Sequence, residues 1–293
     1  MTVTDVNVVK SAIFERPDDA NKGTLGSLLC VCGSYGMAGA AVMSAKGALR
    51  TGIGLAKCAL PRSIYPIVAQ TILESVYYPL SENADSRISK VNVPFLVSES
   101  SKSSATLVGC GLGVCDDTLK IVFSLIENST TPLVLDADAL NCVAKQPEIL
   151  LRKKAPIIIT PHPGEMSRLT GLATPLVNAE RERVALDFTQ KYGVVTVLKG
   201  AGTVIASPNG KVLVNPTGNS GMATGGSGDV LAGTVASLVS RGINETVASA
   251  MAVYIHGLAG DIAKDKYGIE SVIASKVMEC IPCALRQILQ VEK

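Results

Sequence analysis

Short, continuous runs of apolar residues alternate along the chain with longer stretches of helical periodicity. Continuous apolar runs of this length indicate strands buried on both faces, as in a parallel sheet. The predicted strands are 27–32, 54–60, 105–110, 132–135, 156–160 and 194–198. The predicted helices between them are 38–50, 118–126, 147–151 and 176–191. This alternation predicts an α/β fold with a mostly parallel, buried central sheet.

The pattern changes in the last third of the chain. Residues 203–206 and 211–214 are apolar and are separated by a turn with an Asn-Gly dipeptide, which predicts an antiparallel hairpin at the edge of the sheet. Helical periods follow at 229–240, 245–263 and 270–290. The stretch 81–104, rich in serine, asparagine and charge, is expected to be an exposed excursion. No linker or repeat divides the chain, so residues 1–293 are predicted to form a single domain.

Composition excludes several classes of protein. The 293 residues are 47% hydrophobic with a net charge of +2, which argues against disorder. Aromatic residues make up only 4% and the basic residues are scattered, so no nucleic-acid partner is expected. No uninterrupted apolar run reaches about 18 residues, and we therefore expect no membrane partner. The first ten residues lack a secretory pattern, which predicts a cytoplasmic location.

The eight cysteines are predicted to be reduced, because most lie in apolar runs where cysteine acts as a small buried hydrophobe. Cys280 and Cys283 have the Cys-x-Pro-Cys spacing of some redox pairs. A redox pair is expected at the start of a helix after a strand, whereas this pair interrupts a helical pattern. A structural role is therefore favoured. Zinc is not expected, since there is no second ligand pair and the chain has two histidines.

Glycine is concentrated in two segments. Residues 23–54 hold 8 of the 27 glycines and residues 199–242 hold 10. Glycine lets the backbone approach a ligand closely and adopt positive φ, at an entropic cost. Two ligand-contacting loops are the favoured interpretation, and ordinary turns are the alternative.

The sequence Gly225-Gly226-Ser227-Gly228-Asp229 runs directly into an apolar helical pattern. A glycine-rich turn that opens a helix directs free N–H groups and the positive end of the helix dipole at one point, which suits a phosphate or a developing oxyanion. Asp229, in the first turn of that helix, is placed to act as a general base on a hydroxyl group. The alternative is that Asp229 only caps the helix.

Two common nucleotide motifs are absent from these loops. No Gly-Lys-Ser/Thr follows the glycines of the second segment, so it is not a Walker A loop. In the first segment, the stretch from Gly33 to Ala40 has the wrong spacing for a dinucleotide-fold fingerprint. A phosphate-transfer enzyme of another architecture is indicated.

The loop resembles the anion-hole signature of the ribokinase-like fold, and the surrounding sequence resembles the ADP/ATP-dependent NAD(P)H-hydrate dehydratases. The matching blocks lie at 22–23, 33–41, 48–52, 109–113, 134–141, 160–166, 197–203 and 219–229. The most specific of them are Thr160-Pro161-His162-Pro163-Gly164-Glu165 and Asp136-Ala137-Asp138-Ala139-Leu140-Asn141. The chain departs from the family pattern at Cys110, where a proline is common.

This resemblance implies a three-layer α/β/α sandwich and the repair of hydrated NADH or NADPH. In that reaction a nucleotide, ADP or ATP, phosphorylates the ring hydroxyl with Mg²⁺ present, and phosphate is then eliminated. A stand-alone chain resembles the ADP-using branch. The (6R) hydrate is expected to need a separate epimerase, and the resemblance implies a homotetramer.

The resemblance also assigns residues to the site. It implies that the hydrated dinucleotide contacts Gly39, Ala40, Gly111, Gly113, His162 and Asp229. It implies that the adenine nucleotide contacts Lys199, Gly200, Ala201, Gly202, Thr203 and Gly228. It assigns catalysis to Gly226, Ser227, Gly228 and Asp229.

Several of these polar residues have simpler alternatives. Lys199 is expected to meet a phosphate, or else to be a solvated lysine at a strand end. His162 could merely cap its strand. Glu165 is a candidate to hold Mg²⁺ through water. Asp136 and Asp138 follow a predicted strand, at the edge where open α/β sheets bind ligands, or they cap the next helix.

Two other functions remain open from the sequence. One is a ribokinase-like kinase of a vitamin-precursor alcohol, which would share residues 225–229 but stop at phosphorylation. The other is a nucleotide-sensing protein with a dead site, which would be expected to lose Asp229. His256, in an apolar helix, is expected to be a buried histidine with its hydrogen bonds satisfied.

Overall fold

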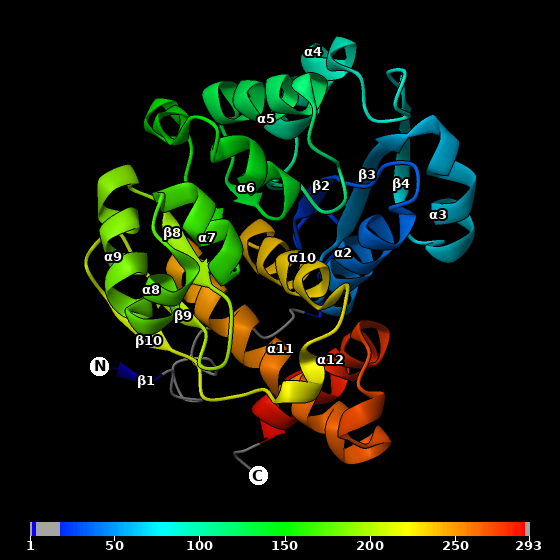
Figure 1. Cartoon of the computed structure of the whole chain (residues 1–293). Coiled ribbons are helices and arrows are strands. Elements are labelled where there is room, and N and C mark those ends of the chain that lie inside the picture. The colour runs from blue at the N-terminus through cyan, green and yellow to red at the C-terminus, as the bar shows by residue number, and fades with distance from the viewer. Residues whose placement is uncertain (1, 4–17, 291–293) are drawn as a thin grey trace.

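A ten-stranded sheet runs through the computed structural model, which describes residues 2–3 and 18–290 (Figure 1). The strands are β1 (Thr2–Val3), β2 (Ser27–Val31), β3 (Leu55–Pro61), β4 (Val76–Leu80), β5 (Ala105–Val108), β6 (Leu133–Leu135), β7 (Ile157–Ile159), β8 (Val195–Leu198), β9 (Val204–Ala206) and β10 (Val212–Val214). Their order in the sheet is β1-β10-β9-β8-β7-β6-β5-β2-β3-β4. The predicted strands are confirmed, and β1 and β4 are additions.

The sheet is parallel from β4 through to β8. Strands β9 and β10 form the predicted antiparallel hairpin, with β9 also antiparallel to β8. Strand β1 pairs parallel with β10 and is the outermost strand on that side. A mostly parallel sheet with antiparallel strands near one edge is therefore confirmed.

Helices cover both faces of the sheet, which makes the predicted three-layer sandwich (Figure 1). One face carries α2 (Ala38–Arg50), α3 (Tyr65–Thr71), α10 (Ser227–Ser240), α11 (Glu245–Tyr267) and α12 (Ala274–Gln290). The other carries α4 (Val93–Ser101), α5 (Asp116–Asn128), α6 (Asp138–Val143), α7 (Pro163–Thr170), α8 (Thr174–Ala179) and α9 (Arg181–Tyr192). Short 3₁₀ helices lie at η1 (Arg62–Ile64), η2 (Lys90–Asn92), η3 (Pro147–Arg152), η4 (Ser220–Met222) and η5 (Ile269–Ser271).

Alternate side chains of each central strand enter opposite cores. In β2, Leu28 and Cys30 pack under the α2 and α10 face, whereas Leu29 and Val31 pack under the α5 face. Successive strand residues point to opposite sides of a sheet, so both sides must be apolar when helices cover both. This is why the strands appear in the sequence as continuous apolar runs.

Two expectations from the sequence are wrong. The stretch 81–104 is not exposed throughout, because it contains α4, whose Leu96 and Ser100 are fully buried. Its buried serines bond within the protein, as Ser100 Oγ does with Ser129 Oγ at 2.8 Å and Ser103 Oγ with the carbonyl of Glu99 at 2.8 Å, so polar residues there are not all exposed. The single helix expected at 176–191 is two helices, α8 and α9, which meet at Glu180.

Helix α11 is long and apolar enough, by length and composition, to cross a membrane. However, 67% of its most apolar window is buried inside the structure. It contacts α10 and α12 and lies under one face of the sheet, as a core helix does.

Helices α2 and α10 approach each other closely through two glycines. A Cβ on Gly233 would lie 2.0 Å from the carbonyl oxygen of Ser44, and a Cβ on Gly47 would lie 2.8 Å from that of Val230. These glycines lie inside helices and are not parts of ligand loops, so each glycine-rich segment also serves packing. The contact holds the start of α10 against α2.

We predict that Gly233→Ala lowers the free energy of unfolding by about 1 to 3 kcal/mol or more, because its methyl group overlaps backbone that cannot move independently. Urea denaturation measures this as a lower unfolding midpoint with an unchanged dependence of the free energy on urea concentration. Gly39→Ala is the matched control, since a Cβ there has no neighbour within 4 Å and Gly39 lies within α2. Equal midpoints for the two variants would contradict the packing role.

Candidate active site

The C-terminal ends of the parallel strands bring most of the predicted site residues to one edge of the sheet. Strands β2, β5, β6, β7 and β8 are adjacent and parallel, so the loops that follow them meet there. Those loops carry Gly33, Gly111, Asp136, His162 and Lys199. Ligands of open α/β sheets bind at this edge, near the point where the strand order reverses. The reversal lies between β2 and β5.

The start of α10 forms the predicted anion hole at the same edge. Gly226 precedes the helix with φ +89°, a conformation that favours glycine. A Cβ on Gly225 would meet nothing within 4 Å, so its backbone faces open space. The first amides of a helix have no acceptor within the helix, and those of Gly228 and Asp229 belong to this first turn. The turn can therefore bind an anion.

Asp229 lies in the first turn of α10 and faces the ends of β5 and β6. Burial, and next the charge of Asp136, raise the pKa of Asp229 from its ordinary 3.8 to about 6. The hydrogen bond from Cys110 and the charge of Lys199 act in the opposite direction and lower it. A carboxylate with a pKa near 6 is ionised at neutral pH yet accepts a proton more readily than an ordinary aspartate, as a general base must.

Lys199, at the end of β8, forms a buried ion pair with Asp136 at the end of β6 and a longer contact with Glu165 in α7. Its Nζ lies 2.7 Å from Asp136 Oδ1 and 3.8 Å from Glu165 Oε2, and its side chain is only 18% exposed. Burial alone would favour the neutral amine, but the charges of Asp136 and Glu165 outweigh it and raise the pKa of Lys199. The alternative of a solvated lysine is therefore wrong. A Cβ on Gly228 would lie 3.3 Å from Nζ, which places the ammonium group beside the anion hole.

His162 and Glu165 begin helix α7 as a reciprocal cap. His162 Nδ1 accepts hydrogen bonds from the amides of Gly164 and Glu165, and Glu165 Oε2 accepts one from the amide of His162. The histidine thus caps the helix that follows, yet half of its side chain stays exposed to the edge of the sheet. Burial raises the pKa of Glu165.

The loops after β2 and β5 are bound to each other. Gly33 donates its amide hydrogen to the carbonyl of Cys110 at 2.8 Å, and the Ser34 hydroxyl donates to the carbonyl of Gly111 at 2.8 Å. Gly111 has φ +66°, and a Cβ there would lie 2.8 Å from that of Ala40. Ala40 and Gly111, predicted for one ligand, therefore lie together.

Two further predicted glycines extend this surface. The amide of Gly113 donates to Asp138 Oδ2 at 2.8 Å, which ties the loop after β5 to the start of α6. Gly39 is in the first turn of α2, where a Cβ would find open space.

The predicted nucleotide loop, residues 199–203, leaves β8 through two glycines in unusual conformations. Gly200 has φ +147° and Gly202 has φ +64°, and the Thr203 hydroxyl closes the turn by donating to the carbonyl of Gly200 at 3.0 Å. The Arg181 guanidinium packs against Gly200 and donates to the carbonyl of Leu198 at 2.8 Å. Its Nε is buried with no hydrogen-bond partner among the described residues. Ala201, at the tip, is exposed.

Two features of the site had no usable signal in the sequence. Ala137, between Asp136 and Asp138, has φ +49° and ψ −115°, a backbone conformation that costs an alanine about 1 to 3 kcal/mol. Such strain is typical of functional sites. Cys110 was noted only as a departure from a family pattern, yet its sulfur and the nearest carboxylate oxygens of Asp136 and Asp229 all lie within 4.8 Å of one another.

His256 is buried behind the anion hole, and its Nε2 lies 3.5 Å from the Ser227 hydroxyl. Burial lowers its pKa to about 4, so the ring is neutral at physiological pH. The prediction of a buried, hydrogen-bonded histidine is confirmed.

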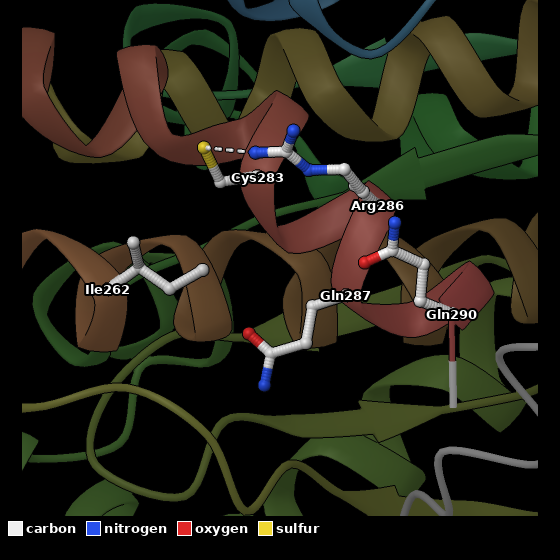
Figure 2. Close-up of a pocket in the computed structure, with 5 residues that line it drawn as sticks. All are labelled: Ile262, Cys283, Arg286, Gln287 and Gln290. Atoms are coloured by element: carbon white, nitrogen blue, oxygen red, sulfur yellow. Dashed lines mark hydrogen bonds between the residues drawn. The ribbon is translucent and has the colours of Figure 1, made fainter. Parts of the chain in front are cut away.

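Cys280 and Cys283 lie within α12, and Figure 2 shows Cys283 on that helix. Cys283 borders a hollow of about 480 Å³ together with Ile262, Arg286, Gln287 and Gln290. The Arg286 guanidinium donates to its sulfur at 3.7 Å. Both cysteines are free and neither opens a helix after a strand, so the structural interpretation is favoured.

We predict that Asp229→Asn stabilises the protein. The unfolded carboxyl ionises near its ordinary 3.8 and the folded one near 6, so ionisation favours the unfolded chain above that range. The variant should gain about 2 to 3 kcal/mol in the free energy of unfolding near neutral pH, and the gain should vanish below about pH 4. Denaturation across this range measures it. A gain that does not change with pH would contradict the burial cost of the charge.

Comparisons with known proteins agree with this geometry. Residues 28–283 match the family model of the NAD(P)H-hydrate dehydratases. The chain is 35% identical over 257 residues to the ADP-dependent (S)-NAD(P)H-hydrate dehydratase of Neisseria meningitidis, covering 87% of this chain and 82% of that protein. The crystal structure of the ADP/ATP-dependent NAD(P)H-hydrate dehydratase of Bacillus subtilis, co-crystallised with ATP/Mg²⁺, superposes with a TM-score of 0.85 at 28% identity, covering 98% of both chains.

A longer relative is the bifunctional NAD(P)H-hydrate repair enzyme Nnr of Thermofilum pendens, 40% identical over 273 residues, which are 93% of this chain and 52% of that protein. The chain thus spans about half the length of such bifunctional relatives. The family match covers most of the residues that form the sheet edge, the anion hole and Asp229. The chain belongs to the NAD(P)H-hydrate dehydratase family and has its ribokinase-like fold.

Proposed function

We propose that this chain is an ADP-dependent (6S)-NAD(P)H-hydrate dehydratase. The observation that carries the proposal is Asp229, a partly buried carboxylate with a pKa of about 6 in the first turn of α10, directly beside the anion hole. A base and an anion hole at one point suit phosphoryl transfer to a hydroxyl group. Membership of the dehydratase family supports hydrated NADH or NADPH as the source of that hydroxyl.

The two substrates would approach Asp229 from opposite sides. The loops after β2 and β5, with the exposed part of His162, would bind the hydrated dinucleotide, in contact with Gly39, Ala40, Gly111 and Gly113. The loop from Lys199 to Thr203 and the amide of Gly228 would bind the adenine nucleotide. Lys199 Nζ, beside Gly228, is placed to attract the terminal phosphate.

The chemistry needs a phosphoryl transfer and then an elimination, and the substrate loses one proton in each. Asp229 takes the proton of the C6 hydroxyl as its oxygen attacks the terminal phosphorus of ADP, and the bond to the departing AMP breaks. The amides of Gly226, Ser227 and Gly228 are the proposed donors to the negative charge on the transferring group, and that of Ser227 would have to leave the carbonyl of Thr224, to which it donates at 3.3 Å. The ring then loses phosphate from C6 and a proton from the adjacent carbon, which restores the double bond and yields NAD(P)H, AMP and phosphate.

Mg²⁺ is proposed to accompany the nucleotide, as in the Bacillus subtilis co-crystal. Bound with phosphates, it supplies charge neutralisation. Both oxygens of Glu165 lie close to His162, and Oε2 also lies near Lys199, so a direct bond to the ion would have to displace these contacts. Contact through water, as predicted, leaves them intact.

The choice of nucleotide, the need for an epimerase, the assembly and the location of the protein are also proposed. ADP is favoured because the Neisseria relative, which this chain resembles over most of its length, is named as ADP-dependent. ATP is the alternative nucleotide, and a kinase of a vitamin-precursor alcohol is the alternative reaction. A separate epimerase, a tetrameric assembly and a cytoplasmic location remain predictions from the resemblance and the sequence.

We expect the protein to convert hydrated NADH to NADH with ADP and Mg²⁺, measured as recovery of the near-ultraviolet absorbance of reduced nicotinamide. Asp229→Asn should lower the rate by about 10²-fold to 10⁴-fold while nucleotide affinity is unchanged, because only the base is removed. The unfolding midpoint of the variant, measured in parallel, controls for loss of the folded state. Absence of recovery with either nucleotide would overturn the proposal, and phosphorylation without recovery would favour the kinase.

The pH dependence of kcat/KM should fall on the acid side with an apparent pKa of about 6. Protonated Asp229 cannot accept the hydroxyl proton. Activity is therefore present above this pKa and is lost as the pH falls through it. Initial rates between about pH 5 and pH 8 measure this. An acid limb near the ordinary pKa of aspartate would show that another group, or an unburied Asp229, acts as the base.

A further inference from the structure

Cys110 is a buried thiol between two carboxylates of the proposed active site. It lies two residues beyond β5, with no exposed surface. Its sulfur donates to Asp136 Oδ2 at 3.7 Å, and a carboxylate oxygen of Asp229 lies nearby. The sulfur and the carboxylate oxygens all lie within 4.8 Å of one another. One S–H group therefore faces two acceptors that belong to different elements, the end of β6 and the start of α10.

The thiol is a donor and not a thiolate. A hydrogen bond with Cys32, and then burial, raise the pKa of Cys110 well above its ordinary value. A protonated thiol is a weak hydrogen-bond donor and a poor nucleophile. Cys110 therefore contributes to the site as a hydrogen-bond donor, and the direction of its S–H bond decides which group it stabilises.

Without a donor between them, the carboxylates of Asp136 and Asp229 would only repel each other. Asp136 Oδ1 is satisfied by Lys199 Nζ at 2.7 Å and by the Thr160 hydroxyl at 2.7 Å, which leaves Oδ2 for Cys110. The charged and titratable groups that act on Asp229 are Asp136, Cys110, Lys199 and Asp138. Of these, Cys110 is the neutral donor shared between the two carboxylates.

We propose that Cys110 is a positioning residue, whose thiol bridges Asp136 and Asp229 and holds the Asp229 carboxylate ionised and oriented for proton transfer. This inference rests on the proposed function for its kinetic consequence, and on the geometry alone for its effect on the ionisation of Asp229. A cysteine that only fills the core would contribute packing and no hydrogen bond.

The test compares Cys110→Ala, Cys110→Ser and the control Cys58→Ala. Cys58 is equally buried, in β3, and has no contact with these carboxylates among the described residues. In Cys110→Ala the acid limb of kcat/KM should move up by about half a pH unit, since a lost hydrogen bond favours protonated Asp229. Cys110→Ser restores a donor and should return the limb toward that of the wild type. Cys58→Ala should leave it unchanged.

A second measurement does not depend on activity. Ionisation of Asp229 lowers stability, so its titration appears as the difference in unfolding midpoint between each protein and its Asp229→Asn counterpart across pH. This titration should move up in Cys110→Ala and recover in Cys110→Ser. An unchanged titration in Cys110→Ala, or equal shifts in all three variants, would overturn the positioning role. Failure of the proposed function would instead appear as an inactive wild type whose Asp229 still titrates as described.

Discussion

The buried ion pair between Lys199 and Asp136 holds the active edge of the sheet together. It joins the ends of β6 and β8, and a longer contact with Glu165 adds the start of α7. Removing charges from water is costly, so the pair adds little net stability, but losing one partner would leave the other charge buried and uncompensated. Here the pair places an ammonium group beside Gly228 at the anion hole. The chain thus keeps a cation buried at the point where a phosphate would arrive.

The same arrangement makes the ionised carboxylate of Asp229 costly for the stability of the fold. This carboxylate lies near Asp136, and burial raises its pKa to about 6. The strained backbone of Ala137 is a second cost at the same edge. Function at this edge therefore depends on interactions elsewhere, above all the two cores on either side of the sheet, to keep the fold stable.

The sequence predicted the sheet and the anion hole because both leave local patterns: continuous apolar strands, and a glycine-rich turn directly before a helix. It did not predict α4, whose serines are bonded internally, or β4, an edge strand that contains a proline. The partner of Lys199 lies 63 residues away, and no spacing rule identifies it. Cys110 resembled any small core residue, since only the fold brings the two carboxylates to its sulfur.

The glycine-rich segments combine two physical roles that composition alone cannot separate. Gly225, Gly226 and Gly228 open the backbone to a ligand, whereas Gly47 and Gly233 let α2 and α10 touch. The second role serves the first. Because α2 follows the loop after β2 and α10 follows the anion hole, close packing of these helices sets how near the two loops can come. Glycines inside the helices therefore allow the start of α10, which carries the anion hole, to lie directly against α2.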